Sequence, residues 1–151
     1  MEDTNHNLSV QLYYSLPGEQ RREVITAENK CDLEPCFMGF IDTYYYLSLL
    51  IPKDWTIIDI GSAYAPQCYY FRDHAKYIAV EPPSKIKLFH MDNTEIYRQT
   101  AKQFINDILP KLNLDMDKTF AICSYVPEWY GENPRALARR VFKNLYCYYP
   151  K

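Results

Sequence analysis

The chain is 151 residues long, 48% hydrophobic and 24% charged, with a formal net charge of −2. This length suits one domain, residues 1–151, with a single buried core. The small net charge predicts neither a nucleic-acid surface nor binding to an anionic membrane. No apolar run reaches the length of a membrane span, and no signal peptide is expected.

The cysteine content bears on the redox environment. There are five cysteines, an odd number, and none of them has C-x-x-C spacing: Cys31, Cys36, Cys68, Cys123 and Cys147. This pattern favours free thiols in a reducing compartment over a zinc site. We therefore expect a cytoplasmic protein without a metal. The 15 tyrosines predict amphipathic aromatic surfaces around a cleft or a partner site.

The first third of the chain divides into a polar arm and an apolar helix. Residues 1–35 are polar and weakly periodic, which predicts a loosely attached N-terminal arm, whereas residues 37–151 carry the core. Helical spacing of apolar residues predicts a helix over residues 37–51 that ends before Pro52. Its expected buried positions are Phe37, Phe40, Ile41, Tyr44, Tyr45 and Leu49.

Two short apolar runs predict neighbouring strands of a parallel sheet. Residues 57–60 form the first run, which stops at Gly61, and residues 77–80 form the second, which stops at Glu81. Pro66 suits the first turn of a short helix over residues 67–75, with His74 as a polar residue near its end. The acid follows the glycine by twenty positions, a separation typical of a βαβ unit that binds the ribose of a nucleoside.

The later elements extend the same alternation of strands and helices. We place the third strand at residues 95–100 and a helix at residues 101–112, because a strand at residues 86–90 leaves too few residues for a parallel crossover. A buried strand follows at residues 119–125. Asn133 is the expected N-cap of a helix over residues 134–144. A fifth strand is expected at residues 145–149.

The glycine-containing loop resembles the first motif of class I S-adenosylmethionine-dependent methyltransferases. The run Asp59-Ile-Gly61-Ser-Ala63-Tyr-Ala65 is similar to their D-x-G-x-G-x-G pattern, with the first glycine kept and alanine in the other two glycine places. Glu81 matches the acid that closes their second strand. The resemblance implies a Rossmann-like three-layer α/β sandwich of about five mostly parallel strands, without the C-terminal β-hairpin of complete members.

The same resemblance implies the residues that would bind S-adenosylmethionine. In the family the loop receives the methionine part of the cofactor, the acid at the end of the second strand holds the ribose hydroxyls, and an Asp-Ala pair after the third strand lies near the adenine. The corresponding residues here are Asp59, Gly61, Ser62, Ala63, Tyr64, Ala65, Glu81, Thr100 and Ala101.

The segment after the fourth strand is the expected substrate side. In the family the end of this strand lies beside the reactive methyl group, and enzymes that methylate amines often carry a [DNS]-P-P-[FYW] tetrad there. The sequence SYVPEWY is only partly similar to that tetrad, so no amine substrate is inferred. The candidate pocket residues are Tyr125, Pro127, Trp129 and Tyr130. Tyr125 and Glu128 are the candidates for a catalytic base. A surface turn with exposed aromatic residues is the alternative interpretation.

Two functions of different classes fit these features. The first is a small S-adenosylmethionine-dependent methyltransferase that acts on a small-molecule or protein substrate. The second is a methyltransferase-like module that binds or regulates without catalysis, because fold and function separate easily. A fifth strand at the edge of the sheet also predicts a homodimer that uses this strand or the tyrosine-rich surface, since edge strands are often covered by another chain.

Overall fold

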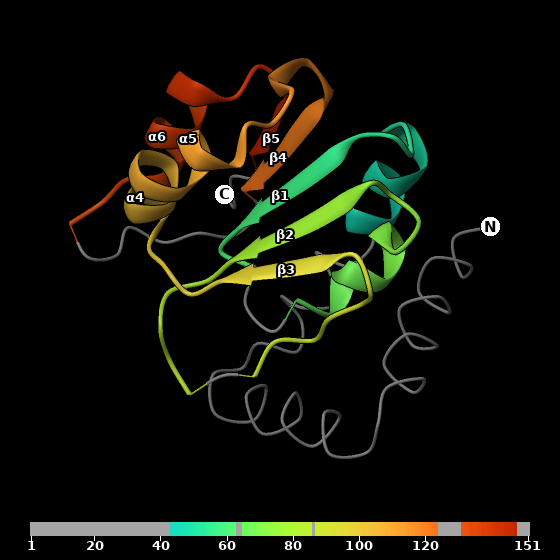
Figure 1. Ribbon diagram of the computed structural model, residues 1–151, viewed down its shortest axis with the longest axis horizontal. Coiled ribbons are helices and arrows are strands. Elements are labelled where there is room, and N and C mark those ends of the chain that lie inside the picture. Colours follow the sequence, from blue (N-terminus) through green and yellow to red (C-terminus); the bar gives the residue numbers. More distant parts are fainter. Residues whose placement is uncertain (1–42, 63–64, 86, 124–130, 148–151) are drawn as a thin grey trace.

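The computed structural model describes residues 43–62, 65–85, 87–123 and 131–147. Within these residues the fold is built on one five-stranded, all-parallel sheet in the order β3-β2-β1-β4-β5 (Figure 1). The strands are β1 (Thr56–Ile60), β2 (Lys76–Val80), β3 (Thr94–Tyr97), β4 (Thr119–Cys123) and β5 (Leu145–Cys147). The order is that of a Rossmann-like α/β fold, as expected from the sequence.

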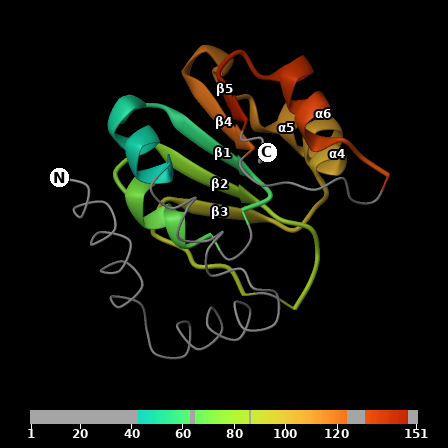
Figure 2. The same cartoon turned by 180° about the vertical axis from the view of Figure 1, so that it is seen from behind.

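Helical elements cover both faces of the sheet, which makes three layers (Figures 1 and 2). A helix over residues 43–50 and the 3₁₀ helix η1 (Pro66–Phe71) pack on one face, where Ile57 contributes to the core. The other face carries α4 (Ala101–Gln103), the π turn η2 (Phe104–Ile108), α5 (Leu109–Leu112) and α6 (Pro134–Val141). A short 3₁₀ turn, η3 (Met116–Lys118), leads into β4.

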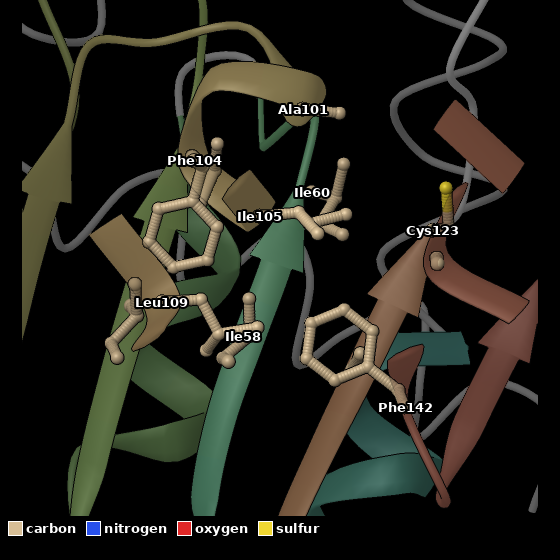
Figure 3. Packing of buried hydrophobic residues seen from close by; sticks show 12 residues of the cluster. Ile58, Ile60, Ala101, Phe104, Ile105, Leu109, Cys123 and Phe142 are labelled. Carbon is tan, nitrogen blue, oxygen red and sulfur yellow. The ribbon is translucent and has the colours of Figure 1, made fainter. Parts of the chain in front are cut away.

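The second face of the sheet holds one of the two cores that the described residues form. Ile58 and Ile60 of β1 meet Phe104 and Ile105 of η2, with Phe142 beside them (Figure 3). Because side chains alternate along a strand, Ile57 packs on the opposite face, and β1 is buried on both sides. This explains why its sequence reads as a nearly continuous apolar run.

The order of the strands determines where the sheet can bind a ligand. The chain proceeds outward from β1 through β2 to β3, and it then returns to the other side of β1 to form β4 and β5. In open α/β sheets ligands bind at the carboxyl ends of the strands, beside the point where the order reverses. That point lies here between β1 and β4, and the predicted glycine loop follows the carboxyl end of β1.

The predicted helix over residues 101–112 is interrupted. The Leu109 N–H donates to the carbonyl of Phe104, five residues earlier, so the middle of this helix is a π turn. Pro110 follows at once, and proline cannot donate the N–H of an α-helical hydrogen bond. Wider π turns are one way in which a helix accommodates such a break.

The predicted helix over residues 37–51 is confirmed for residues 43–50, but one buried position was wrong. Tyr44 and Ser48, four residues apart, face the core, whereas Leu49 is 63% exposed. The Ser48 hydroxyl donates to the Tyr45 carbonyl at 2.6 Å, which satisfies the polar group inside the protein. Residues 37–42 lie outside the described part of the chain.

The other predicted elements are present, with bounds that differ by a few residues, and the predicted ends of the fourth and fifth strands, residues 124–125 and 148–149, lie outside the described part of the chain. The third strand occupies the preferred position but ends at Tyr97, and residues 87–90 of the alternative form no strand. The short helix expected over residues 67–75 is the 3₁₀ helix η1, which ends at Phe71. Asn133 caps α6, with its Oδ1 accepting from the Ala136 N–H at 3.1 Å. None of the helices in the described residues has the length and apolarity needed to cross a bilayer.

Candidate functional site

The candidate site begins at the turn that ends β1. Gly61 has a φ of 72°, a conformation that glycine adopts without steric cost. The N–H groups of Gly61 and Ser62 both point to the Val80 carbonyl, at 2.8 and 3.3 Å. The turn is therefore held against the carboxyl end of β2, next to Glu81.

Ala65 also adopts a left-handed conformation, with a φ of 58°. It stands where the methyltransferase motif has its third glycine, and it is fully buried and directly precedes η1. A non-glycine residue in this region costs about 1–2 kcal/mol. The turn thus adopts a glycine-type conformation at this position although the residue is alanine.

Asp59 lies one residue from the end of β1 and is completely buried. Its Oδ1 accepts a hydrogen bond from the Tyr44 hydroxyl at 2.9 Å, and its Oδ2 accepts from Gln67 Nε2 at 2.7 Å and from the Tyr77 hydroxyl. Burial raises the pKa of Asp59 to about 6, although the hydrogen bonds from Gln67, Tyr77 and Tyr44 act to lower it. Burial also raises the pKa of Tyr77, so that its hydroxyl keeps the proton that it donates.

The Asp59 network is tied to the turn through Gln67. The same Gln67 Nε2 that donates to Asp59 also lies 3.0 Å from the Ser62 carbonyl. Asp59 thus fixes the position of the turn through other residues. The sequence predicts contact between Asp59 and the cofactor, and that remains a prediction. The sequence does not identify Tyr44, Gln67 or Tyr77 as its partners, because they come from three separate elements.

Glu81 follows the last residue of β2 and is only 5% exposed. Its N–H donates to the Tyr97 carbonyl at 3.1 Å, which holds the ends of β2 and β3 together. Two buried polar atoms near these strand ends have no hydrogen-bond partner among the described residues, namely Ser62 Oγ and Gln99 Oε1. Buried polar groups are normally paired, so unpaired ones at a ligand-binding edge indicate sites that can accept a polar ligand.

Thr100 and Ala101, expected near an adenine ring, have structural roles at the start of α4. Thr100 Oγ1 accepts from the Gln103 N–H at 3.2 Å, and Gln103 Oε1 accepts from the Thr100 N–H at 3.0 Å. These two bonds form a capping box, which stabilises the start of a helix. Ala101 is buried in the core of the second face.

Several predicted site residues lie outside the described part of the chain. They are Ala63 and Tyr64 of the loop and the whole substrate-side group: Tyr125, Pro127, Glu128, Trp129 and Tyr130. Their roles remain predictions. Within the described ranges no three or more His, Cys, Asp or Glu residues are grouped so as to hold a metal ion.

His74, predicted as a polar residue near the end of the short helix, is buried. It is 4% exposed, and its Nε2 lies 3.0 Å from the Ile51 carbonyl oxygen, to which it donates. Its ring meets that of Phe71 edge to face at 5.2 Å. Burial lowers the pKa of His74, which favours the neutral ring. These contacts assign His74 to the core next to η1.

Comparisons with known proteins leave the family open. No family model matches the chain, and no curated protein matches it. Among solved structures, it matches that of a candidate type II methyltransferase from Anaeromyxobacter dehalogenans, with 17% sequence identity and a TM-score of 0.48. The match covers 68% of this chain and 42% of the other chain. A likeness this distant carries no argument about activity, and the assignment of the fold rests on the order of the strands.

Proposed function

We propose that this chain binds S-adenosylmethionine at the carboxyl ends of β1 and β2 and acts as a methyltransferase on a small-molecule or protein substrate. One observation carries the proposal. The left-handed Gly61 turn is hydrogen-bonded to Val80, the last residue of β2, so that it lies next to the buried residue Glu81. A tight backbone turn next to a buried acid is the arrangement that nucleoside cofactors use in Rossmann-type sheets.

In this proposal each described residue has a separate task. Gly61 lets the backbone approach the methionine part of the cofactor, and the Ser62 hydroxyl, unpaired in the described residues, offers it a hydrogen bond. Glu81 accepts hydrogen bonds from the two ribose hydroxyls. Asp59 keeps the turn in place through Gln67. The bound cofactor would supply an electrophilic methyl group.

Methyl transfer from a sulfonium depends mainly on alignment and on the exclusion of water, so it needs few ionisable groups. The chain's contribution would therefore be to orient the acceptor atom. The residues proposed for this are Tyr125, Pro127, Trp129 and Tyr130, with Tyr125 or Glu128 as the base where the acceptor must lose a proton.

A second function is favoured by the capping box at Thr100. The family has an acid near this position, and here both the hydroxyl and the N–H of Thr100 are engaged in starting α4. Weaker binding of the adenine ring would suit a module that binds a nucleoside ligand, or a protein partner, without turnover. Edge strand β5 offers such a module, or the enzyme, a surface for a homodimer.

The two functions are separated by measuring binding and turnover on the same preparation. Titration with S-adenosylmethionine should show saturable binding to the wild type and much weaker binding to Glu81→Gln, which keeps the size of the side chain but removes its charge. Glu95→Gln is the matched control, because it makes the same chemical change on β3, at a partly exposed residue whose carboxylate pairs with Lys76 at 3.1 Å. Transfer of labelled methyl groups to a cell extract would indicate an enzyme. Binding without methyl transfer would favour the non-catalytic module. Absence of binding would refute both the methyltransferase and a module that binds S-adenosylmethionine.

A further inference from the structure

Two cysteines lie on neighbouring strands at the carboxyl edge of the sheet, the edge that also carries the Gly61 turn. Cys123 is the last residue of β4, and Cys147 is the last residue of β5. The two are directly paired in the parallel register of these strands. Paired residues of neighbouring strands point to the same face, and both side chains belong to the core that Ile60 and Phe142 share (Figure 3).

The register places the two thiol groups on neighbouring strands at the same level of the sheet. Cys147 is close enough to Cys123 to raise the pKa of its thiol. Adjacent strands lie about 4.7–4.9 Å apart, within the range of Cα separations, roughly 4.4–6.8 Å, that a disulfide can bridge. The backbone therefore already has the spacing that a disulfide requires.

The two sulfur atoms differ in access. Cys123 is fully buried, whereas Cys147 lies on the edge strand and is half-buried. A reagent from solution therefore meets Cys147 first. We propose that Cys123 and Cys147 form a redox-active dithiol site that reacts with small disulfides of the glutathione class and closes to a reversible disulfide.

The reaction proceeds in two exchange steps. The Cys147 thiolate attacks one sulfur of oxidised glutathione, which forms a mixed disulfide and expels one glutathione thiolate. Cys123 then gives up its proton and attacks the Cys147 sulfur, which breaks the mixed disulfide and expels the second glutathione, now carrying a proton. The two protein thiols are oxidised, and one molecule of oxidised glutathione is reduced to two thiols.

The environment of Cys123 determines which step is slow. Burial and the neighbouring Cys147 raise the pKa of the Cys123 thiol to about 12, so that little thiolate is present at neutral pH. The second step should therefore be slower than the first, and the mixed disulfide at Cys147 should appear before the cross-link. The proposal does not rest on the proposed function, because neither cysteine is among the residues assigned to the cofactor, although both lie at the same edge of the sheet.

The test uses a parent protein in which Cys31 and Cys36 are replaced by serine, so that only the three described cysteines can react. The folded parent protein is incubated with oxidised glutathione, and samples taken over time are analysed by non-reducing peptide mapping. A glutathionyl adduct on Cys147 should come first and a peptide cross-linked through Cys123 and Cys147 second. The cross-linked protein should melt several degrees higher, because the unfolded chain is constrained, and dithiothreitol should reverse the shift.

Three variants define the outcome. Cys123→Ser should stop at the adduct on Cys147, and Cys147→Ser should form neither product. Cys68→Ser is the matched control, because Cys68 is buried on the opposite face and its loss should leave the cross-link unchanged. An adduct on Cys147 that never resolves, or a cross-link through Cys68, would overturn the proposal. The mapping of the parent protein decides this even where a variant folds poorly.

Discussion

Replacing Asp59 by asparagine should change how the stability of the fold depends on pH. Asp59 is completely buried, and its pKa is raised from 3.8 to about 6. Between these two values the folded state binds more protons than the unfolded state, so stability falls as the pH rises. The stabilising contribution of protonated Asp59 to the free energy of unfolding is therefore fully present below pH 3.8 and is lost as the pH rises past about 6.

The size of this effect follows from the shift. A shift from 3.8 to about 6, at about 1.4 kcal/mol per pH unit, makes the ionised Asp59 cost about 3 kcal/mol of folding free energy near neutral pH. Asp59 is not exposed to solvent, so this free-energy cost is not reduced by solvent screening. Asparagine cannot ionise, so its free energy of unfolding lacks this dependence.

The assay is urea unfolding of the wild type and of Asp59→Asn across the range from about pH 4 to pH 7. The free energy of the wild type minus that of the variant should fall by about 2–3 kcal/mol over this range. The absolute difference in the free energy of unfolding between the two proteins depends on how well the asparagine amide fits among three hydrogen-bond donors. The change of that difference with pH does not depend on this fit. Asp107→Asn, on the exposed side of η2, controls for the loss of one negative charge. A difference between wild type and Asp59→Asn that stays constant with pH would refute the reasoning.

Three further changes test the packing, the backbone and the edge of the sheet. Phe104→Ala should lower the free energy of unfolding by about 3–5 kcal/mol in chemical denaturation, because Phe104 is fully buried against Tyr97, whereas Ile96→Ala on the exposed side of β3 should cost far less. Gly131→Ala should lower the free energy of unfolding by about 1–2 kcal/mol, because Gly131 has a φ of +71° that alanine tolerates poorly. The added methyl group meets nothing within 4 Å, so no steric clash adds to this cost. Light scattering at high protein concentration should report a homodimer, and a monomer would rule out pairing through β5.

The sheet could be predicted from the sequence because its strands are buried on both faces. Ile57, Ile58 and Ile60 leave no polar side to the first strand apart from Asp59, and such runs are typical of parallel sheets. The twenty residues from Gly61 to Glu81 suit one crossover, and the structure places the ends of β1 and β2 side by side. Local composition therefore carried most of the information about the strands and their direction.

The helices were harder to predict where apolar residues surround them. The run from Tyr44 to Leu50 is apolar at every position except Ser48, so the periodicity does not identify the inward face, and Leu49 was wrongly placed in the core. The structure buries Ser48 because its hydroxyl can bond to the helix backbone. Pro110 was a visible signal that the helix beginning at Ala101 could not stay regular, but not of the wider turn that results.

The partners of Asp59 could not be predicted from local sequence. The Tyr44 and Tyr77 hydroxyls come from positions 15 residues before it and 18 residues after it, and a motif around Asp59 contains neither of them. An acid inside an otherwise apolar strand is the one available signal, because such a group must be paired when it is buried. The same signal is consistent with a ligand and with a side-chain network, and only the fold shows the network.

The most direct test of the central claim is the thermal unfolding of the protein with and without S-adenosylmethionine. At about 100 times its dissociation constant a ligand stabilises the folded state by about 2.7 kcal/mol, and each kcal/mol raises the Tm of a domain of this size by roughly 2–4 °C. A rise of several degrees is therefore expected for the wild type. Gly61→Val should abolish it, because valine tolerates the observed φ of 72° poorly and blocks the approach of the backbone. An unchanged Tm in millimolar S-adenosylmethionine, with no heat in calorimetry, would contradict the claim.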